Sequence, residues 1–158
     1  MKKFAVEIKW SAILTIAELL WMLLEKKLDW HDALIAKQPI YTMLFSIVAI
    51  ILFVLAIKDK KKNYYESKID WKQGFLSGSI VALIVAILSP LNQYISMEII
   101  SPNYFQNAIN NAVLNNNMSL ENAKDFFNLK SYIFQTAFGG LSTGIVTSAI
   151  IAYFIKTK

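Results

Sequence analysis

The chain has 158 residues, of which 56% are hydrophobic and 17% are charged, and its formal net charge is +5. Because soluble domains carry roughly 25% charged residues, this composition excludes an ordinary soluble enzyme. All sixteen basic residues are lysines. Arginine is the residue best suited to base readout and bidentate phosphate contacts, so its absence argues against a nucleic-acid partner. The sequence also contains no cysteine, which excludes disulfides, thiolate nucleophiles and cysteine metal sites.

Four predominantly apolar stretches of about 18 to 25 residues each are long enough to cross a bilayer. A backbone surrounded by lipid must satisfy its hydrogen bonds within the segment, so each stretch is expected to be a helix. We therefore predict an all-α, integral membrane four-helix bundle that forms a single domain over residues 1–158. The predicted spans run from about Phe4 to Leu24, Ile40 to Ile57, Gly74 to Ile95 and Ser131 to Ile155.

The lysines divide unequally between the two sides of such a bundle, and lysine-rich loops stay in the cytoplasm. The distribution predicts a multi-pass protein with both termini in the cytoplasm and the lipid bilayer as its surroundings. The predicted cytoplasmic side carries eleven lysines: Lys2, Lys3, Lys9, Lys58, Lys60, Lys61, Lys62, Lys68, Lys72, Lys156 and Lys158. The opposite side carries five: Lys26, Lys27, Lys37, Lys124 and Lys130.

The long loop over residues 96–130 is rich in asparagine and contains two short helical patterns. Pro102 suits the first turn of one helix, and Ser119 can cap the other. We predict two amphipathic helices outside the membrane, lying against the bundle or the lipid headgroups. The apolar positions of the two patterns are Tyr104, Phe105, Ala108, Ile109, Ala112 and Val113, and then Ala123, Phe126 and Phe127.

The third and fourth spans each carry small residues at a spacing of four, which keeps them on one helix face. Such stripes let two helix backbones approach closely in lipid. They predict direct packing of the third span against the fourth, or alternatively a dimer interface. The stripes consist of Gly74, Gly78, Ala82 and Ala86 in the third span, and of Thr136, Gly140, Gly144, Ser148 and Ala152 in the fourth.

Glu18 is the one ionisable residue deep inside a predicted span, and Glu7, Ser11 and Thr15 share its helix face. A charged carboxylate at this depth is costly, so this face should point into the bundle. Two hypotheses follow: Glu18 binds a proton or cation in a polar pocket, or a protonated Glu18 holds helices together by hydrogen bonding. The predicted polar cluster comprises Glu18, Thr15, Ser89, Asn92, Gln93, Gln135 and Thr136.

Glu25, Asp29, His31 and Asp32 lie just beyond the first span. Imidazole and carboxylate can bind metals, but one histidine among loop acids is more often solvated, and we expect that here. The chain shows no phosphate loop, zinc-helix motif, serine elbow or hydrolytic carboxylate pair. We therefore predict no enzyme, and no catalytic, cofactor or metal site.

Several short motifs, in their order and spacing, resemble a family of small four-span membrane proteins from Bacteroidota that is catalogued as a domain of unknown function. The resemblance covers nearly the whole chain. It implies a bacterial inner-membrane protein with the four-helix layout, and it supplies no activity, cofactor or catalytic residue. The motifs are Leu24-Glu25-Lys26-Lys27 with His31-Asp32, Pro39-Ile40-Tyr41-Thr42, Trp71-Lys72-Gln73-Gly74-Phe75, Ser89-Pro90-Leu91-Asn92-Gln93-Tyr94, Ser101-Pro102-Asn103-Tyr104-Phe105 and Asn128-Leu129-Lys130.

Two functions fit these observations. The first is a structural, interaction or assembly component that binds a second copy of itself or another membrane protein. The alternative is a small transporter or proton-coupled accessory subunit that uses the pocket around Glu18. A water-filled cavity that reaches Glu18 would favour the second function, and a dry contact with Asn92, Gln93 or Gln135 would favour a purely structural carboxyl.

Overall fold

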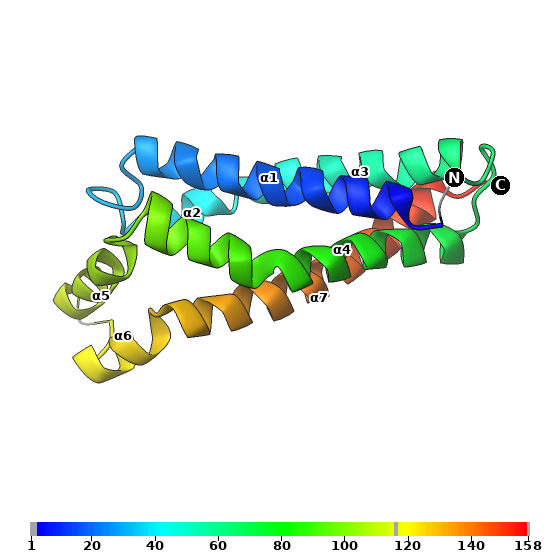
Figure 1. Cartoon of the computed structure of the whole chain (residues 1–158). Coiled ribbons are helices and arrows are strands. Elements are labelled where there is room, and N and C mark those ends of the chain that lie inside the picture. Colours follow the sequence, from blue (N-terminus) through cyan, green and yellow to red (C-terminus); the bar gives the residue numbers. More distant parts are fainter. Residues whose placement is uncertain (1–2, 116, 158) are drawn as a thin grey trace.

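The computed structural model describes residues 3–115 and 117–157, so Lys2 and Lys158 of the lysine count lie outside the described residues. Every regular element over the described residues is helical (Figure 1), which confirms the predicted all-α fold. The elements are α1 (Ala5–Lys27), α2 (Gln38–Thr42), α3 (Phe45–Asn63), α4 (Trp71–Tyr94), the π-helix η1 (Ile95–Ile100), α5 (Tyr104–Leu114), α6 (Leu120–Phe126) and α7 (Leu129–Ile155).

Side-chain caps explain where three of these helices begin. Asp70 and Gln73 form a reciprocal capping box at the start of α4. The Ser119 hydroxyl accepts a hydrogen bond from the Asn122 amide at 3.2 Å, as expected for the start of α6. The Asn128 carbonyl oxygen accepts from the Ser131 amide at 2.9 Å at the start of α7. Each cap pairs a backbone N–H that the first turn of a helix leaves without a partner.

The long helices α1, α3, α4 and α7 form a four-helix bundle. α4 packs most extensively against α7, α1 lies against α3 and α4, and α3 also contacts α7. Figure 1 shows both termini at one end of the bundle and α5 and α6 at the other. We call these the terminal end and the α5–α6 end. All four helices contribute buried side chains to the core, among them Leu14, Phe53, Ile57, Val81 and Ile151.

Small residues let α4 and α7 approach each other closely over the half of the interface nearer the terminal end. A methyl carbon added to Gly78 would lie only 2.6 Å from Ser148 Cβ, and one added to Gly144 would lie 2.6 Å from Ala82 Cβ. Real side-chain carbons essentially never come so close, so these two positions require glycine. At Gly140 an added carbon would meet nothing within 4 Å. The tight contact therefore ends before Gly140, because the space there is unfilled.

The segments Gln38–Asn63, Trp71–Ile100 and Leu129–Ile155 are long and apolar enough to cross a membrane. α1 has a similar length, but its sequence is more highly charged. Large apolar side chains stand exposed between the two ends of the bundle, such as Leu20, Ile87 and Phe138, each more than 60% accessible. A water-soluble surface rarely exposes such a continuous apolar area, so these helices fit a membrane protein.

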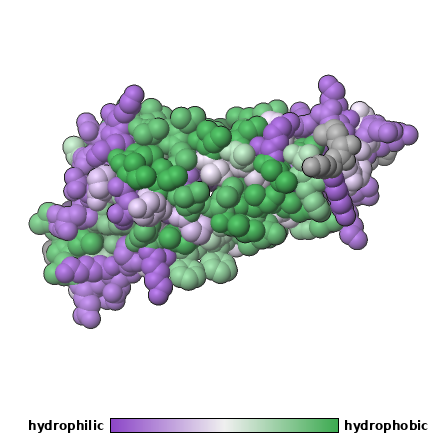
Figure 2. Space-filling view, in the orientation of Figure 1, coloured by the Kyte–Doolittle hydropathy of each residue, from purple (hydrophilic) through white to green (hydrophobic). Residues whose placement is uncertain are grey.

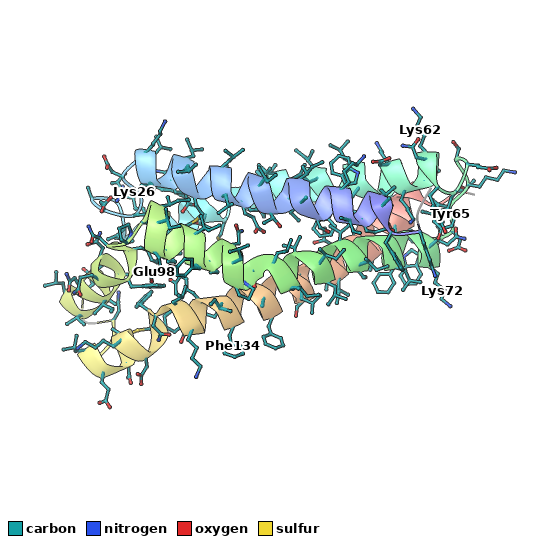
Figure 3. All side chains as sticks on the ribbon, in the orientation of Figure 1. Lys26, Lys62, Tyr65, Lys72, Glu98 and Phe134 are labelled. Carbon is teal, nitrogen blue, oxygen red and sulfur yellow. The ribbon has the colours of Figure 1, made fainter. Side chains whose placement is uncertain are left out.

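The polar and apolar surfaces of the molecule are segregated along its length. Figure 2 shows hydrophobic residues over the middle and hydrophilic residues gathered at both ends. In Figure 3, Lys62 and Lys72 lie at the terminal end, Lys26 and Glu98 lie toward the α5–α6 end, and Phe134 points outward from α7. This distribution matches two aqueous surfaces separated by an apolar layer.

The two predicted amphipathic helices are present as α5 and α6, and they pack on each other through Ala112 and Ala123. Tyr104 and Ala108 attach α5 to Met97 of η1. One detail of the prediction is wrong: Pro102 lies in a turn before α5 rather than in its first helical turn. The chain leaves η1 at Ser101, whose carbonyl accepts a hydrogen bond from the Tyr104 amide at 3.0 Å, so the new helix starts after the proline.

Candidate functional site

Glu18 of α1 meets Asn92 of α4 inside the bundle. The Asn92 Nδ2 amide donates a hydrogen bond to Glu18 Oε2 at 2.6 Å, and Asn92 is 4% exposed. A carboxyl group removed from water needs such a donor, because burying it unpaired is costly. The contact joins two bundle helices at a depth where polar pairs are rare.

Glu18 and Asn92 line a cavity of about 200 Å³, which we call the central cavity. Its walls come from α1, α2, α3, α4, η1 and α7. Four buried oxygens of its lining residues have no hydrogen-bond partner among the described residues: Ser89 Oγ, Asn92 Oδ1, Gln93 Oε1 and Ser96 Oγ. Because buried polar atoms are nearly always paired, these oxygens indicate that a polar guest belongs in the cavity.

A second cavity of about 470 Å³ adjoins the central cavity. It reaches from the buried side chains of Leu14 and Phe53 out to Ile50 of α3 and Thr143 of α7, which are both exposed. We call it the lateral cavity, because it opens on the side of the bundle between α3 and α7. The residues that line both cavities are Glu18, Thr42, Phe45, Val85 and Gly140.

A third cavity, of about 590 Å³, lies beneath α5 and α6 and is called the α5–α6 cavity. Tyr104, Phe127 and Tyr132 line it. It shares Thr42 and Thr136 with the central cavity. The three cavities therefore form a series from the α5–α6 end, past Glu18, to the side of the bundle. Thr42 lines all three.

The structure brings together most of the predicted polar cluster. Ser89, Asn92, Gln93 and Thr136 line the central cavity with Glu18. Gln135 is exposed and lines the α5–α6 cavity but not the central one. Thr15 does not line the central cavity, although its hydroxyl is buried without a partner among the described residues. Three members of the small-residue stripes, Ala86, Thr136 and Gly140, line the central cavity.

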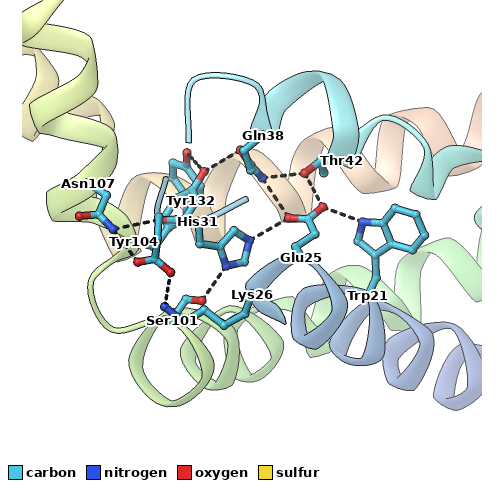
Figure 4. Close-up of polar contacts among 11 residues, drawn as sticks. Trp21, Glu25, Lys26, His31, Gln38, Thr42, Ser101, Tyr104, Asn107 and Tyr132 are labelled. Carbon is cyan, nitrogen blue, oxygen red and sulfur yellow. Dashed lines mark hydrogen bonds and ion pairs between the residues drawn. The ribbon is translucent and has the colours of Figure 1, made fainter. Parts of the chain in front are cut away.

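A second polar centre, which the sequence did not predict, lies at the α5–α6 end. Glu25 and His31 are completely buried, so the expectation that these loop residues are solvated is wrong. His31 Nε2 lies 2.8 Å from Glu25 Oε2. Trp21 Nε1 and the Thr42 hydroxyl each donate to Glu25 Oε1 at 2.6 Å. His31 belongs to the segment between α1 and α2, which brings its imidazole to Glu25 (Figure 4).

The network around Glu25 extends to α5 and α7. His31 Nδ1 lies 2.6 Å from the hydroxyl of Ser101. Burial, with Tyr132 alongside, raises the pKa of the Tyr104 hydroxyl far above its usual range. The Tyr104 hydroxyl is therefore protonated, and it donates to Gln38 Oε1 at 3.1 Å. These contacts, drawn in Figure 4, join α1, α2 and the segment between them to Ser101, α5 and α7.

Glu25, His31 and Ser101 have the residue types of a hydrolytic serine–histidine–carboxylate triad. A nucleophilic serine must reach a substrate, but Ser101 is 0% exposed. Ser101 also lines none of the three cavities. The arrangement therefore connects helices and does not present a nucleophile. Within the part of the chain that the structure describes, no three histidine, aspartate or glutamate side chains converge on a possible metal position.

Hydrogen bonding keeps Glu25 ionised. Burial alone would raise the pKa of its carboxyl, but the donors His31, Thr42, Gln38 and Trp21 outweigh burial and hold this pKa below its usual value. A carboxyl whose pKa falls on folding contributes stability above its unfolded pKa, which is about 4.3 for glutamate. That contribution is lost as the pH falls through the folded pKa.

We expect the Glu25→Gln variant to lose about 1–3 kcal/mol of stability at neutral pH, because hydrogen bonds to a charged acceptor become weaker neutral ones. Below the folded pKa of Glu25, the stabilities of the variant and the wild type should become equal. Thermal unfolding in detergent across this acidic window measures the difference. Glu121→Gln, at an exposed position of α6, is the matched control. If the difference in stability between Glu25→Gln and the wild type were the same at every pH, it would contradict a stabilising role of the ionised Glu25.

The terminal end contains a buried ion pair. Lys60 Nζ of α3 lies 2.9 Å from Glu7 Oε1 of α1, and the Ser77 hydroxyl of α4 donates to the same oxygen at 2.8 Å. Lys60 is 3% exposed. Lys60 is one of the eleven lysines of the predicted cytoplasmic side, but its side chain turns inward and pairs with Glu7 instead of facing water. The predicted inward direction of Glu7 and Ser11 agrees with their burial.

One signal in the sequence could have revealed the Glu25 centre. Trp21 and Glu25 are four residues apart, so they share a helix face, where the indole N–H can donate to the carboxylate. No comparable signal exists for Ser101, Tyr104 or Gln38, because they join the network around Glu25 from other parts of the chain.

Comparison with known proteins now gives this architecture a family. A family model described as "Protein of unknown function (DUF4199)" matches residues 9–157. The chain belongs to this family. The match covers α1 from Lys9 onward and every later element of the bundle, so the cavities and both polar centres lie within the DUF4199 region. Neither the curated proteins nor the solved structures yield a significant match to the chain.

Proposed function

We propose that this DUF4199 protein is a four-span protein of the bacterial cytoplasmic membrane with both termini in the cytoplasm. α1 is the fourth span, because it runs beside the three apolar helices in the same bundle. Its charged and polar residues Glu7 and Ser11 face inward and so do not meet lipid. An even number of spans agrees with the two termini lying at one end. The lysine excess at that end supports its cytoplasmic orientation.

Within this membrane setting, Glu18 binds a proton or a small cation, and the protein acts as a small transporter or a proton-coupled subunit rather than an enzyme. The observation that carries this proposal is the position of Glu18 in the series of three cavities. A carboxyl that only held helices together would lie in a dry contact. Here the Asn92 hydrogen bond occupies one side of Glu18, and cavities lie beside it.

The test of this function is ion movement into proteoliposomes that contain the purified chain. We expect proton or sodium uptake in the wild type, and about tenfold or more slower uptake in Glu18→Gln, which keeps the Asn92 hydrogen bond but cannot take up a proton or pair with a cation. Glu121→Gln should transport like the wild type. Equal uptake by Glu18→Gln and wild type, with both proteins folded, would overturn the proposal.

A second candidate function is a structural, interaction or assembly component that binds another membrane protein or a second copy of this chain. The observation that favours it is the apolar exposure on the two helices outside the bundle, where Leu114 is 81% and Leu120 is 52% accessible. This function does not need Glu18. Two results together would favour this structural function over transport. Wild-type proteoliposomes would show no ion uptake, and both the wild type and Glu18→Gln would form a stable complex with another membrane protein or a second copy of the chain.

A further inference from the structure

The lining of the lateral cavity indicates what kind of ligand reaches Glu18. The lateral cavity is lined mainly by apolar side chains, including Leu14, Ala49, Ile50 and Phe53. Its volume of about 470 Å³ lies within the range of roughly 300–1,000 Å³ that is typical of small-molecule sites. A strongly hydrated ion gains nothing from such walls, whereas an apolar ligand does.

The entrance of the lateral cavity faces the bilayer in the proposed arrangement. The exposed rim residue Ile50 lies near the middle of the apolar segment Gln38–Asn63, and Thr143 lies near the middle of α7; both segments are able to span a membrane. A ligand that enters here arrives from the lipid, so it must itself be lipid-soluble.

The inner end of the same cavity favours positive charge. Glu18 is the one ionisable side chain among the described residues that line the lateral and central cavities. The unpaired oxygens Asn92 Oδ1 and Gln93 Oε1 add further negative dipole ends in the central cavity. Since Asn92 Nδ2 is already bound to Glu18, its oxygen is the atom left for a guest.

Aromatic rings complete this electrostatic environment. Phe45 lines both cavities, and Trp21 lines the central one. The two rings lie 5.6 Å apart between centroids and are tilted by 52°. Aromatic faces attract organic cations, most strongly where water is excluded. A carboxylate, amide oxygens and aromatic faces in an apolar cavity form a site suited to a cation without a tight hydration shell.

We propose that the lateral and central cavities together bind a lipophilic organic cation, which enters from the bilayer between α3 and α7 and places its charge beside Glu18. The proposal rests on the proposed function of Glu18 and names the class of ligand that this residue recognises. The positive charge pairs with the Glu18 carboxylate, and the apolar groups occupy the space between Leu14, Ile50 and Phe53.

The probe for this site is tetraphenylphosphonium, with tetraphenylborate as an anion of the same shape. We expect saturable binding of the phosphonium to the purified full-length chain in detergent, measured by equilibrium dialysis. Glu18→Gln should weaken that binding by about tenfold or more, because the paired charge is lost. Tetraphenylborate should show no binding that depends on Glu18. Undiminished phosphonium binding by Glu18→Gln would overturn the proposal.

Adjacent glycines provide a matched test that leaves Glu18 intact. An added side-chain carbon would meet nothing within 4 Å at either Gly139 or Gly140, so phenylalanine at either position should be compatible with folding. Gly140 lines both cavities, whereas Gly139 lines neither. We expect Gly140→Phe to reduce phosphonium binding by about tenfold and Gly139→Phe to retain it. Equal binding by the two variants would overturn the assignment of the cavity.

The experiments can disprove the ligand class and the transport function independently of each other. If ion uptake by proteoliposomes depends on Glu18 but the phosphonium does not bind, the ligand class is wrong and the function of Glu18 stands. If the phosphonium binds in a Glu18-dependent manner, the ligand class is supported even where no ion uptake is detected, and the transport function alone fails.

Discussion

Replacing Lys60 with methionine should destabilise the protein by about 3–5 kcal/mol, because the substitution leaves the buried Glu7 carboxylate without its positive partner. Lys60 Nζ lies 2.9 Å from Glu7 Oε1, and the Glu7 residue is 1% exposed. Methionine has a similar length to the aliphatic part of lysine, so the packing of that part of the side chain should change little. Reversible unfolding in mixed micelles of detergent and dodecyl sulfate measures the free energy of unfolding.

Two further variants separate the effect of charge from that of shape. Lys62→Met removes an exposed lysine two residues away, and we expect a change within about 0.5 kcal/mol. The double variant Lys60→Met with Glu7→Gln has no unpaired charge, and it should recover most of the lost stability. If Lys60→Met is no less stable than Lys62→Met, the ion pair contributes nothing and this description of the terminal end is wrong.

Replacing Gly78 with alanine should separate α4 from α7, although the change adds a single methyl group. That methyl carbon would lie 2.6 Å from Ser148 Cβ, on a helix backbone that cannot move aside locally. Overpacking of this kind costs about 1–3 kcal/mol, and we expect the upper part of this range. The higher helix propensity of alanine recovers only about 1 kcal/mol. Thermal unfolding in detergent measures the loss.

A compensating substitution tests whether the steric contact is the cause. Ser148→Gly removes the Cβ atom that the new methyl group would meet, so Gly78→Ala with Ser148→Gly should be more stable than Gly78→Ala alone. Gly139→Ala is the matched control, since nothing lies within 4 Å of an added carbon there. A Gly78→Ala protein with wild-type stability would show that α4 and α7 are further apart than described.

These expectations show which parts of the fold follow from local patterns. Helix periodicity and first-turn hydrogen bonding act over only a few residues. They account for the apolar spans, for the small residues on α4 and α7, and for the Ser119 cap. These features could therefore be recognised without tertiary information. The family membership likewise rests on motifs spread along the chain.

The candidate site could be recognised only in part. Glu18 stands out because a lone carboxyl inside an apolar stretch is anomalous. Its pairing with Asn92, and not with Gln135, depends on how the helices are rotated in the bundle. The rotation of a helix follows from the packing of all its neighbours, and no segment of the sequence specifies it alone.

The amino-acid sequence alone determined that this is an all-helical, membrane-compatible protein with one deeply placed carboxyl, since burial of apolar surface and backbone hydrogen bonding leave little other choice. The tertiary structure was needed to locate the three cavities, the burial of Glu25 and His31, and the inward turn of Lys60. Each of these depends on contacts between residues that are distant in the chain. The sequence does not show whether a charged or polar side chain forms its hydrogen bonds with water or with a buried partner. Only the packing of the helices distinguishes these two cases.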